Sequence, residues 1–263
     1  MRKPQTPPLI EDLVAAVSSS TNLSNVMLAS SPLDPKGRYL HWDEMRNRTP
    51  PDSLSHDEWW LGTALARRSI SRDLPLMATD GRPFRFSNVD PIQEMVHRID
   101  QQASGQILAD DLVTDLRSSD RYLVSSLVEE AITSSQLEGA STTRQVAKEL
   151  LATGRKPRDR SEQMIANNFQ AMLFAQDLSP DPLTPQAVLE LHRIVTEDAL
   201  DDPADAGRLQ VSGEERIGVY WDDVLLHRPP DAVELPERLR AMCAFANGDA
   251  PDGFIHPVVR SIV

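Results

Sequence analysis

The sequence has few of the features that cross-link a protein or anchor it in a membrane. It contains one cysteine, Cys243, so no internal disulfide can form and a secreted disulfide scaffold is excluded. Its longest uncharged stretch, residues 13–33, is interrupted by serine, threonine and asparagine, so we expect neither a membrane-spanning segment nor a membrane partner. A reducing, cytoplasmic location is therefore favoured.

Positive charge is scarce as well. Lysine and arginine together number 27 against 40 aspartate and glutamate residues, which gives a formal net charge of −13. The stretch from Glu197 to Asp252 is rich in acid and has no lysine. Nucleic acids and anionic membranes attract basic surfaces. We therefore expect no nucleic-acid partner and interpret the acidic stretch as a solvated set of loops.

Several widespread site motifs are missing. The sequence has no Walker loop, no GxGxxG, no HExxH and no paired CxxC. None of its six histidines pairs with another at the helical spacing of metal ligands. Asp201-Asp202 and Asp222-Asp223 are interpreted as solvated loop acids, so no metal site is expected.

What the sequence does have, from residue 90 onward, is helical periodicity. Apolar side chains recur at helical spacing in residues 91–100 and in residues 122–138, where Gly139 gives a natural stop. Further helices are predicted from capping signals at Thr142 with Gln145, Asp159 with Glu162 and Thr184-Pro185, and from the pattern of residues 236–246.

Some features within this helical part have ordinary structural interpretations. His97 and His192 fall on predicted helices and are interpreted as partly buried packing residues. The basic residues 154–160 are interpreted as a solvated connection. Cys243 is expected to be a small core residue.

The remaining parts are less regular. Residues 1–60 are rich in proline, serine and asparagine, and we expect a loosely structured start with one or two short helices. His41, Trp42 and the pair Trp59-Trp60 are interpreted as packing anchors of this segment. A helix is predicted from about residue 57 to residue 69, and a short strand around Phe84 and Phe86. Residues 207–226 are β-prone, with Ser212-Gly213-Glu214 as the predicted hairpin turn. The expected fold class is mostly α.

One stretch is more specific. Residues 130–143 read Glu-Ala-Ile-Thr-Ser-Ser-Gln-Leu-Glu-Gly-Ala-Ser-Thr-Thr. By periodicity alone, Ser134 and Glu138 form a polar stripe at a helix end, because residues four apart share a face. The stretch resembles the inhibitory helix of Fic (Fido-domain) family proteins, whose pattern is Ser/Thr-x-x-x-Glu-Gly/Asn. The resemblance makes Ser134, Glu138 and Gly139 the inhibitory, ATP-proximal residues.

Four later segments resemble the same family in the expected order. They are residues 167–171, 183–192, 206–230 and 254–260. The third resembles a β-hairpin flap that docks the target, and the resemblance assigns to it Gly207, Arg208, Ile217 and Val219. The likeness covers about residues 120–263, as an inhibitory helix and the first part of a Fic domain. Residues 1–119 are expected to form a helical, partly irregular N-terminal extension.

The resemblance implies a Fic-type helical fold with a small β-hairpin flap. It also implies transfer of AMP from ATP, with Mg²⁺, to a Ser, Thr or Tyr hydroxyl of a protein substrate, with a homo-oligomer as one option. The family's catalytic loop, His-Pro-Phe-x-Asp/Glu-Gly-Asn-Gly-Arg-x-x-Arg, does not occur in the sequence, and His256-Pro257 resembles an earlier His-Pro. We therefore expect a protein cut one helix short of its catalytic centre. This chain should have no catalytic residue, bind neither ATP nor Mg²⁺ well, and be inactive alone.

In the family, the inhibitory glutamate pairs with the last arginine of the loop and blocks productive placement of the ATP γ-phosphate. The resemblance gives this role to Glu138, with Ser134 fixing the helix end. Two alternatives stay open. The chain could be a non-catalytic, antitoxin-like regulator that acts in trans, or a helical interaction module of another family. The target protein, the oligomeric state and the nature of the transferred group stay open too.

Overall fold

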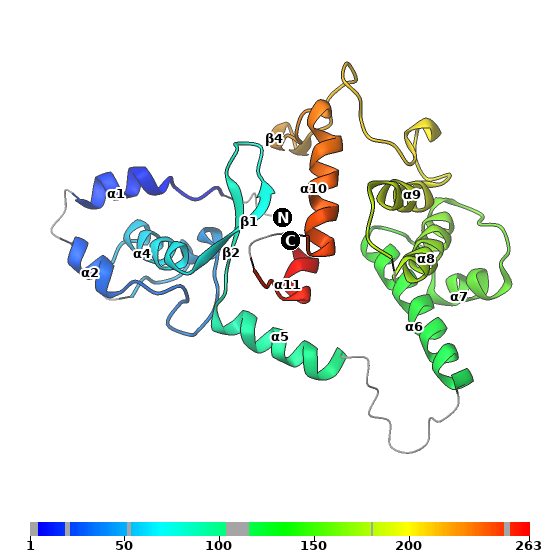
Figure 1. Ribbon diagram of the computed structural model, residues 1–263, viewed down its shortest axis with the longest axis horizontal. Helices are drawn as coiled ribbons and strands as arrows, with labels where there is room; N and C mark the ends of the chain where they lie inside the picture. Colours follow the sequence, from blue (N-terminus) through cyan, green and yellow to red (C-terminus); the bar gives the residue numbers. More distant parts are fainter. Residues whose placement is uncertain (1–4, 19–21, 52–53, 104–115, 180, 250–252) are drawn as a thin grey trace. The chain divides into compact units, whose positions relative to one another are not determined.

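The protein is mostly α-helical, as the sequence predicts. A computed structural model describes residues 5–18, 22–51, 54–103, 116–179, 181–249 and 253–263 (Figure 1). The helices are α1 (Ile10–Ser18), α2 (Leu23–Leu28), α3 (Trp42–Met45), α4 (His56–Ser69), α5 (Asp90–Ala103), α6 (Leu116–Leu137), α7 (Arg144–Thr153), α8 (Arg160–Leu178), α9 (Pro185–Thr196), α10 (Leu235–Asn247) and α11 (Pro257–Ile262), with 3₁₀ turns η1 (Pro203–Asp205) and η2 (Ala232–Glu234). Strands β1 (Ser71–Met77) and β2 (Pro83–Ser87) form one antiparallel pair, and β3 (Val219–Trp221) and β4 (Val224–His227) form another.

The chain divides into two compact units. The N-terminal unit comprises residues 1–106, 219–227 and 254–263, and the helical unit comprises residues 107–218 and 228–253. The chain therefore returns twice to the N-terminal unit, once with the β3–β4 hairpin and once with α11. The boundary expected after residue 119 stays a prediction, because residues 104–115 lie outside the described part of the chain.

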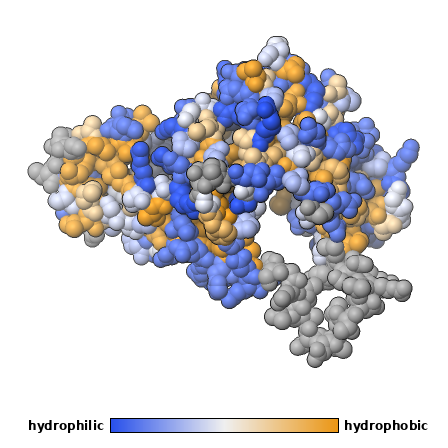
Figure 2. All heavy atoms as spheres, in the orientation of Figure 1, coloured by the Kyte–Doolittle hydropathy of each residue, from blue (hydrophilic) through white to orange (hydrophobic). Residues whose placement is uncertain are grey.

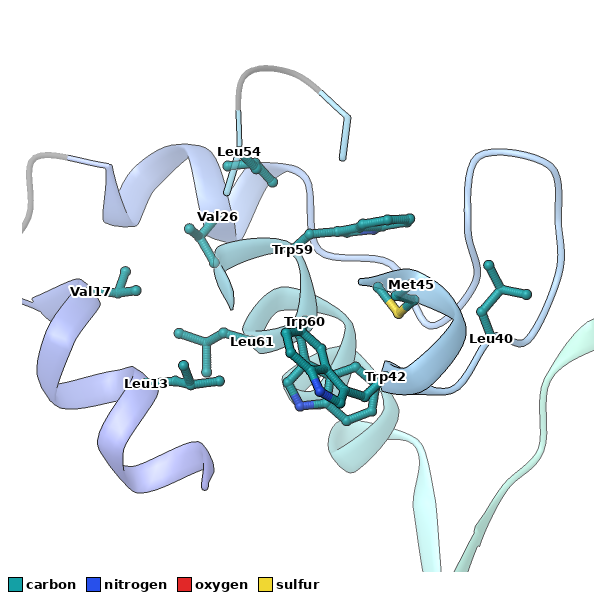
Figure 3. Packing of buried hydrophobic residues seen from close by; sticks show 10 residues of the cluster. All are labelled: Leu13, Val17, Val26, Leu40, Trp42, Met45, Leu54, Trp59, Trp60 and Leu61. Atoms are coloured by element: carbon teal, nitrogen blue, oxygen red, sulfur yellow. The ribbon is translucent and has the colours of Figure 1, made fainter. Parts of the chain in front are cut away.

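A hydrophobic core forms around α4 in the N-terminal unit, so the expectation of a loosely structured start for residues 1–60 is wrong. The indoles of Trp42 and Trp60 lie 6.0 Å apart, and Leu61 is 1% exposed (Figure 3). A buried aromatic side chain removes about 150–250 Å² from water. The large tryptophan side chains thus bury enough apolar surface for a core to form between short helices. These helices lie in a segment rich in proline and serine. The members of the core are Leu13, Val17, Val26, Leu40, Trp42, Met45, Leu54, Trp59, Trp60 and Leu61.

The start of α4 is fixed by a capping box. The backbone N–H of Glu58 donates to Oγ of Ser55 at 3.2 Å, and the N–H of Ser55 donates to Oε2 of Glu58 at 2.8 Å. Nδ2 of Asn22 donates to the other Glu58 oxygen at 2.8 Å, which ties the start of α2 to α4. The Ser55 N–H is the largest cause of the lowered pKa of Glu58.

The predicted strand around Phe84 and Phe86 is confirmed as β2. It pairs with β1 in the register Ser71 with Ser87 and Met77 with Pro83. Strand β1 was not predicted; it contains Pro75, which lacks a backbone N–H and is uncommon inside strands.

Some apolar side chains of the N-terminal unit stay outside the core. On the face shown in Figure 2, hydrophobic residues gather over the region of α1 and α2. Exposed members of these helices and their flanks are Leu9, Val14, Leu23, Met27 and Leu28. Leu28 is 87% exposed, so it contributes little to the core.

The helical unit is organised around α8, which packs against α6 and α9. Ile132 of α6, Ala147 of α7 and Ile165 of α8 meet in a buried cluster that Ala140 completes. Small alanine side chains let the three helices approach closely. Cys243 of α10 is 3% exposed, which confirms it as a core residue, and burial raises the pKa of its thiol.

Asn167 on α8 caps the end of α9 from the side. Its Nδ2 donates to the carbonyl oxygens of Val195, at 3.3 Å, and Glu197, at 2.7 Å. Its Oδ1 accepts from Nε2 of Gln163 at 2.8 Å. The last carbonyls of a helix have no partner within the helix. A buried amide therefore joins two helices by supplying the missing donors.

The helix ends agree with the sequence signals except at one position. Asp159 and Thr184 cap α8 and α9, and Gly154 ends α7 in the left-handed region with φ of 62°. The expected capping box at Thr142 is wrong by one residue. The hydroxyl of Thr143 accepts from the N–H of Val146 at 3.4 Å, because the helix begins only after Thr143.

The basic loop before α8 is mostly the solvated connection that the sequence suggested, since Lys156, Arg158 and Arg160 are exposed, but Arg155 is half-buried. Arg155 donates twice to the carboxylate of Glu162, at 2.6 and 2.8 Å, and the N–H of Arg158 donates to it at 2.8 Å. Glu162 is 3% exposed. These donors, led by Arg155, lower the pKa of Glu162 from its ordinary 4.5 to about 2.

The Leu61→Ala change should lower the free energy of unfolding by about 2–5 kcal/mol, because it removes buried methyl groups and leaves a cavity. Leu28→Ala, on an exposed leucine, is the matched control and should change little. Urea unfolding followed by tryptophan fluorescence measures both. Equal losses in the two variants would contradict the core described above.

The pair of Glu162 and Arg155 should make stability depend on pH. The pKa of Glu162 is lower in the folded than in the unfolded chain, so its contribution is complete above about pH 4.5 and is lost as the pH falls toward about 2. Glu162→Gln should therefore have a lower free energy of unfolding than the wild type at neutral pH. The difference between the two free energies should become smaller in acid. A difference in free energy of unfolding that stays constant between neutral pH and about pH 3 would contradict the lowered pKa of Glu162.

The matched control is Glu190→Gln, which removes the carboxylate of a surface pair with Arg193. Surface ion pairs contribute little. Its unfolding curve should stay close to that of the wild type at each pH.

Candidate functional site

Helix α6 ends in a Schellman motif. Gly139 has φ of 100°, in the left-handed region that glycine tolerates. Its N–H donates to the carbonyl of Gln136 at 3.1 Å, and the N–H of Ala140 donates to the carbonyl of Ser135 at 2.9 Å. The predicted stop at Gly139 is confirmed. The motif also determines where Glu138 leaves the helix.

Glu138 is exposed at this helix end. The preceding side chain, Leu137, is 88% exposed. A carboxylate here faces the negative end of the helix dipole, and the last turn of α6 has no basic side chain. The position is therefore slightly unfavourable for the stability of α6.

The last turn of α6 is supported from the side by α8. Nδ2 of Asn168 lies 3.4 Å from the carbonyl oxygen of Ala131 and 3.4 Å from Oγ of Ser135. Ser134 bonds backward along its own helix, where its Oγ donates to Oε1 of Glu130 at 2.8 Å. The turn that presents Glu138 is therefore held in place while the glutamate itself stays exposed.

The segment between α9 and β3 lines an open pocket of about 520 Å³ in the helical unit. Two predicted flap residues, Arg208 and Ile217, line this pocket together with His192 of α9. Ile217 is 68% exposed. The structure thus brings these two flap residues around one surface depression.

Gly207 lets this segment lie directly on α9. Its φ is 72°, and a Cβ there would come within 2.8 Å of Cβ of Arg193 and 3.2 Å of the carbonyl oxygen of Leu189. Its N–H donates to Nδ1 of His192 at 2.9 Å, so the neutral imidazole carries its proton on Nε2. His192 is half-buried, as predicted.

Arg208 ties its own loop together. Its guanidinium lies 2.8 Å from Oε1 of Glu214 and also pairs with Asp205. These bonds, that of Glu214 first, raise the pKa of Arg208, and Arg208 in turn lowers the pKa of Glu214. Asp202 and Glu215 line the same pocket. The pocket is therefore acidic and does not suit a phosphate-rich ligand.

Val219 belongs to a different unit from the other predicted site residues. It is 52% exposed in β3, and the β3–β4 hairpin groups with the N-terminal unit. Residues 211–214 do form a turn, in which the N–H of Glu214 donates to the carbonyl of Val211 at 3.3 Å. The turn of the hairpin, however, lies at Asp222-Asp223, so the prediction that Ser212-Gly213-Glu214 is the hairpin turn is wrong. The φ of 48° at Asp222 supplies the left-handed residue that a two-residue hairpin turn needs.

The sequence analysis missed a pocket of about 390 Å³ in the N-terminal unit. At its edge, Nε2 of His256 lies 3.0 Å from Oδ2 of Asp100, and Nδ1 of His256 accepts from the N–H of Val258 at 3.3 Å. Arg72 donates to the carbonyl of Phe254 at 2.8 Å. The two long-range bonds span 156 and 182 positions, and no sequence pattern joins such distant residues.

His97 is exposed and lines the same pocket, so its interpretation as a partly buried packing residue is wrong. Helix α5 buries only one side, and His97 lies on the side that faces the pocket. A titratable side chain on an exposed amphipathic helix gives the same sequence pattern whether it faces bulk water or a pocket.

Comparisons of the chain with protein-family models, with curated proteins and with solved structures give no match. Within the described part of the chain, no three histidine, cysteine, aspartate or glutamate side chains are placed to hold a metal ion together. None of the described helices combines the length and the apolar character that crossing a membrane requires.

Replacement of Gly207 by alanine should destabilise the helical unit more than the same change at Gly213. Both glycines have positive φ, and an alanine there costs about 1–2 kcal/mol of strain. Only Gly207 also lacks room for a Cβ. Thermal unfolding of the two variants measures the difference. Equal losses would show that the segment does not lie against α9 as described.

Proposed function

We propose that this chain carries the inhibitory helix and flap of a Fic-type protein adenylyltransferase, an enzyme that transfers AMP from ATP to a hydroxyl of a target protein. The proposed fold is the Fic-type helical fold with a small hairpin flap. The observation that carries the proposal is the end of α6. There, Ser134 and Glu138 sit one turn apart, and Gly139 ends the helix with Glu138 exposed.

Three features support this proposal beyond the motif itself. Glu138 occupies a position where a carboxylate does not help the helix. The turn that bears it is braced by Asn168, from the segment that resembles the next part of the family pattern. Thr184 begins α9, and the segment at Gly207 packs on that helix, in the order that the resemblance implies.

We infer that the described residues of the helical unit do not by themselves form the family's site for ATP and Mg²⁺. The Gly-Asn-Gly turn, the two arginines and the acidic residue of the family's loop do not occur in the sequence. The pocket beside Arg208 is lined by several carboxylates, which repel a triphosphate. We therefore assign the chain a regulatory and target-docking role, in which Glu138 would pair with an arginine supplied by a catalytic loop.

The proposal predicts that this chain alone transfers no AMP when incubated with labelled ATP and Mg²⁺. When the family's catalytic loop is joined to the chain, self-labelling should appear and should rise in Glu138→Gly, because the inhibitory carboxylate is gone. Mass spectrometry of the modified protein gives the readout. The control is Glu149→Gln, which changes an exposed glutamate of α7.

Two results would contradict the proposal. One is labelling by the chain alone above background. The other is unchanged self-labelling in Glu138→Gly when the wild-type chain with the loop is active.

A second candidate is a regulator that inhibits a complete Fic protein in trans. The observation that favours it is the exposure of both Leu137 and Glu138, which leaves an apolar and an acidic group available to a partner. Adding this chain to a Fic protein without an inhibitory helix of its own should then lower the labelling of that protein. Glu138→Gln should weaken the effect, and an equal effect of both chains would exclude this candidate.

A further inference from the structure

The pocket of the N-terminal unit has the size and build of a small-molecule site. Its volume of about 390 Å³ falls within the range of ligand pockets, about 300–1,000 Å³. Ile255, which is 3% exposed, and the half-buried Ile92 and Val96 of α5 give it an apolar lining. Polar side chains line the remainder.

Two phenyl rings line this pocket, those of Phe86 and Phe254. Phe254 is 74% exposed, so most of its ring is accessible to a ligand. Its backbone is held by the bond from Arg72 to its carbonyl, and its ring meets the imidazole of His256 edge to face at 6.0 Å. An exposed aromatic ring on a fixed backbone offers a surface on which a planar ligand can stack.

Amide and imidazole groups line the same pocket. They belong to Asn88, Gln93 and His97, which are exposed and therefore accessible to a ligand in the pocket. An amide presents a donor and an acceptor side by side. That pattern matches the edge of a nucleobase, where a donor and an acceptor are adjacent.

The other charged groups at the pocket limit what else could bind there. Asp100 and His256 bond to each other, and the second ring nitrogen of His256 accepts from the backbone N–H of Val258. Within the described residues, no cluster suits a metal ion. Arg72, stacked 6.0 Å from the ring of Phe86, adds one positive charge that tolerates an anionic substituent.

We propose that this pocket binds a small molecule with a nucleobase-type heteroaromatic ring, which stacks on Phe254 and bonds through its edge to Asn88 and Gln93. The proposal does not rest on the inhibitory role of Glu138. All residues that line the pocket belong to the N-terminal unit, whereas Glu138 belongs to the helical unit.

Isothermal titration of the full chain with adenosine tests the proposal. Phe254→Ala should weaken binding by at least about fivefold, because stacking on an aromatic side chain provides much of the affinity for a base. Gln93→Ala should also weaken it. The control is Phe84→Ala on β2, the strand that also bears Phe86. Phe84 is 49% exposed but does not line the pocket, so its removal should leave the affinity within about twofold.

Two further titrations test whether the heteroaromatic ring of adenosine, and not another part of the ligand or another part of the chain, accounts for binding. Ribose 5-phosphate should bind more weakly than adenosine, and Glu138→Gln should bind adenosine like the wild type. The proposal is overturned if adenosine does not bind, if ribose 5-phosphate binds as tightly, or if Phe254→Ala and Phe84→Ala bind equally well. An effect of Glu138→Gln without an effect of Phe254→Ala would place the binding in the helical unit and overturn it too.

Discussion

The left-handed conformation of Gly139 is the constraint on which the arrangement of the candidate site depends. With φ of 100°, this glycine turns the chain at the end of α6 and directs Ala140 into the cluster formed by Ile132, Ala147 and Ile165. The same turn leaves Glu138 on the outside. The conformation of Gly139 therefore buries Ala140 and leaves the carboxylate of Glu138 exposed. The core of the helical unit and the candidate site depend on the same turn.

Polar side chains connect the helices and loops around this turn. Glu162 gathers the basic loop before α8 through Arg155, and Asn167 supplies donors to the open end of α9. Asn168, the next residue, supports the last turn of α6. Because these bonds are at least partly shielded from water, each one restricts a loop or helix end more than a surface pair would. Under the proposed function, this support would hold Glu138 in position to pair with an arginine.

Local signals made most of the helices predictable. Gly139, Asp159 and Thr184 mark helix ends correctly because their effects act within four residues. Trp42, Trp59 and Trp60 were correctly expected to be packing residues, but the sequence did not show that Trp42 and Trp60 meet from different helices to form one core. It also missed strand β1 and placed the β3–β4 turn too early, since strand pairing depends on partners that local patterns do not name.

One of the two candidate sites could be predicted from local sequence signals, and the other could not. The helix end at Glu138 could be located from the sequence, because its geometry is set by the adjacent glycine. The pocket at Phe254 could not, since Asp100 and His256 come together only through the fold. In the basic loop, the solvated interpretation fails at Arg155 for a related reason. A charge run gives the same pattern whether it is solvated or, as at Arg155, bound to a buried carboxylate.

The central claim is that Glu138 serves function and not the stability of the fold. The most direct measurement is the thermal unfolding temperature of Glu138→Lys and Glu138→Gln in the present chain. Both should unfold at the temperature of the wild type or above it, with lysine the higher, because a cation suits the end of α6. A clear fall in the unfolding temperature of both variants would show that Glu138 supports the structure, and would contradict the account.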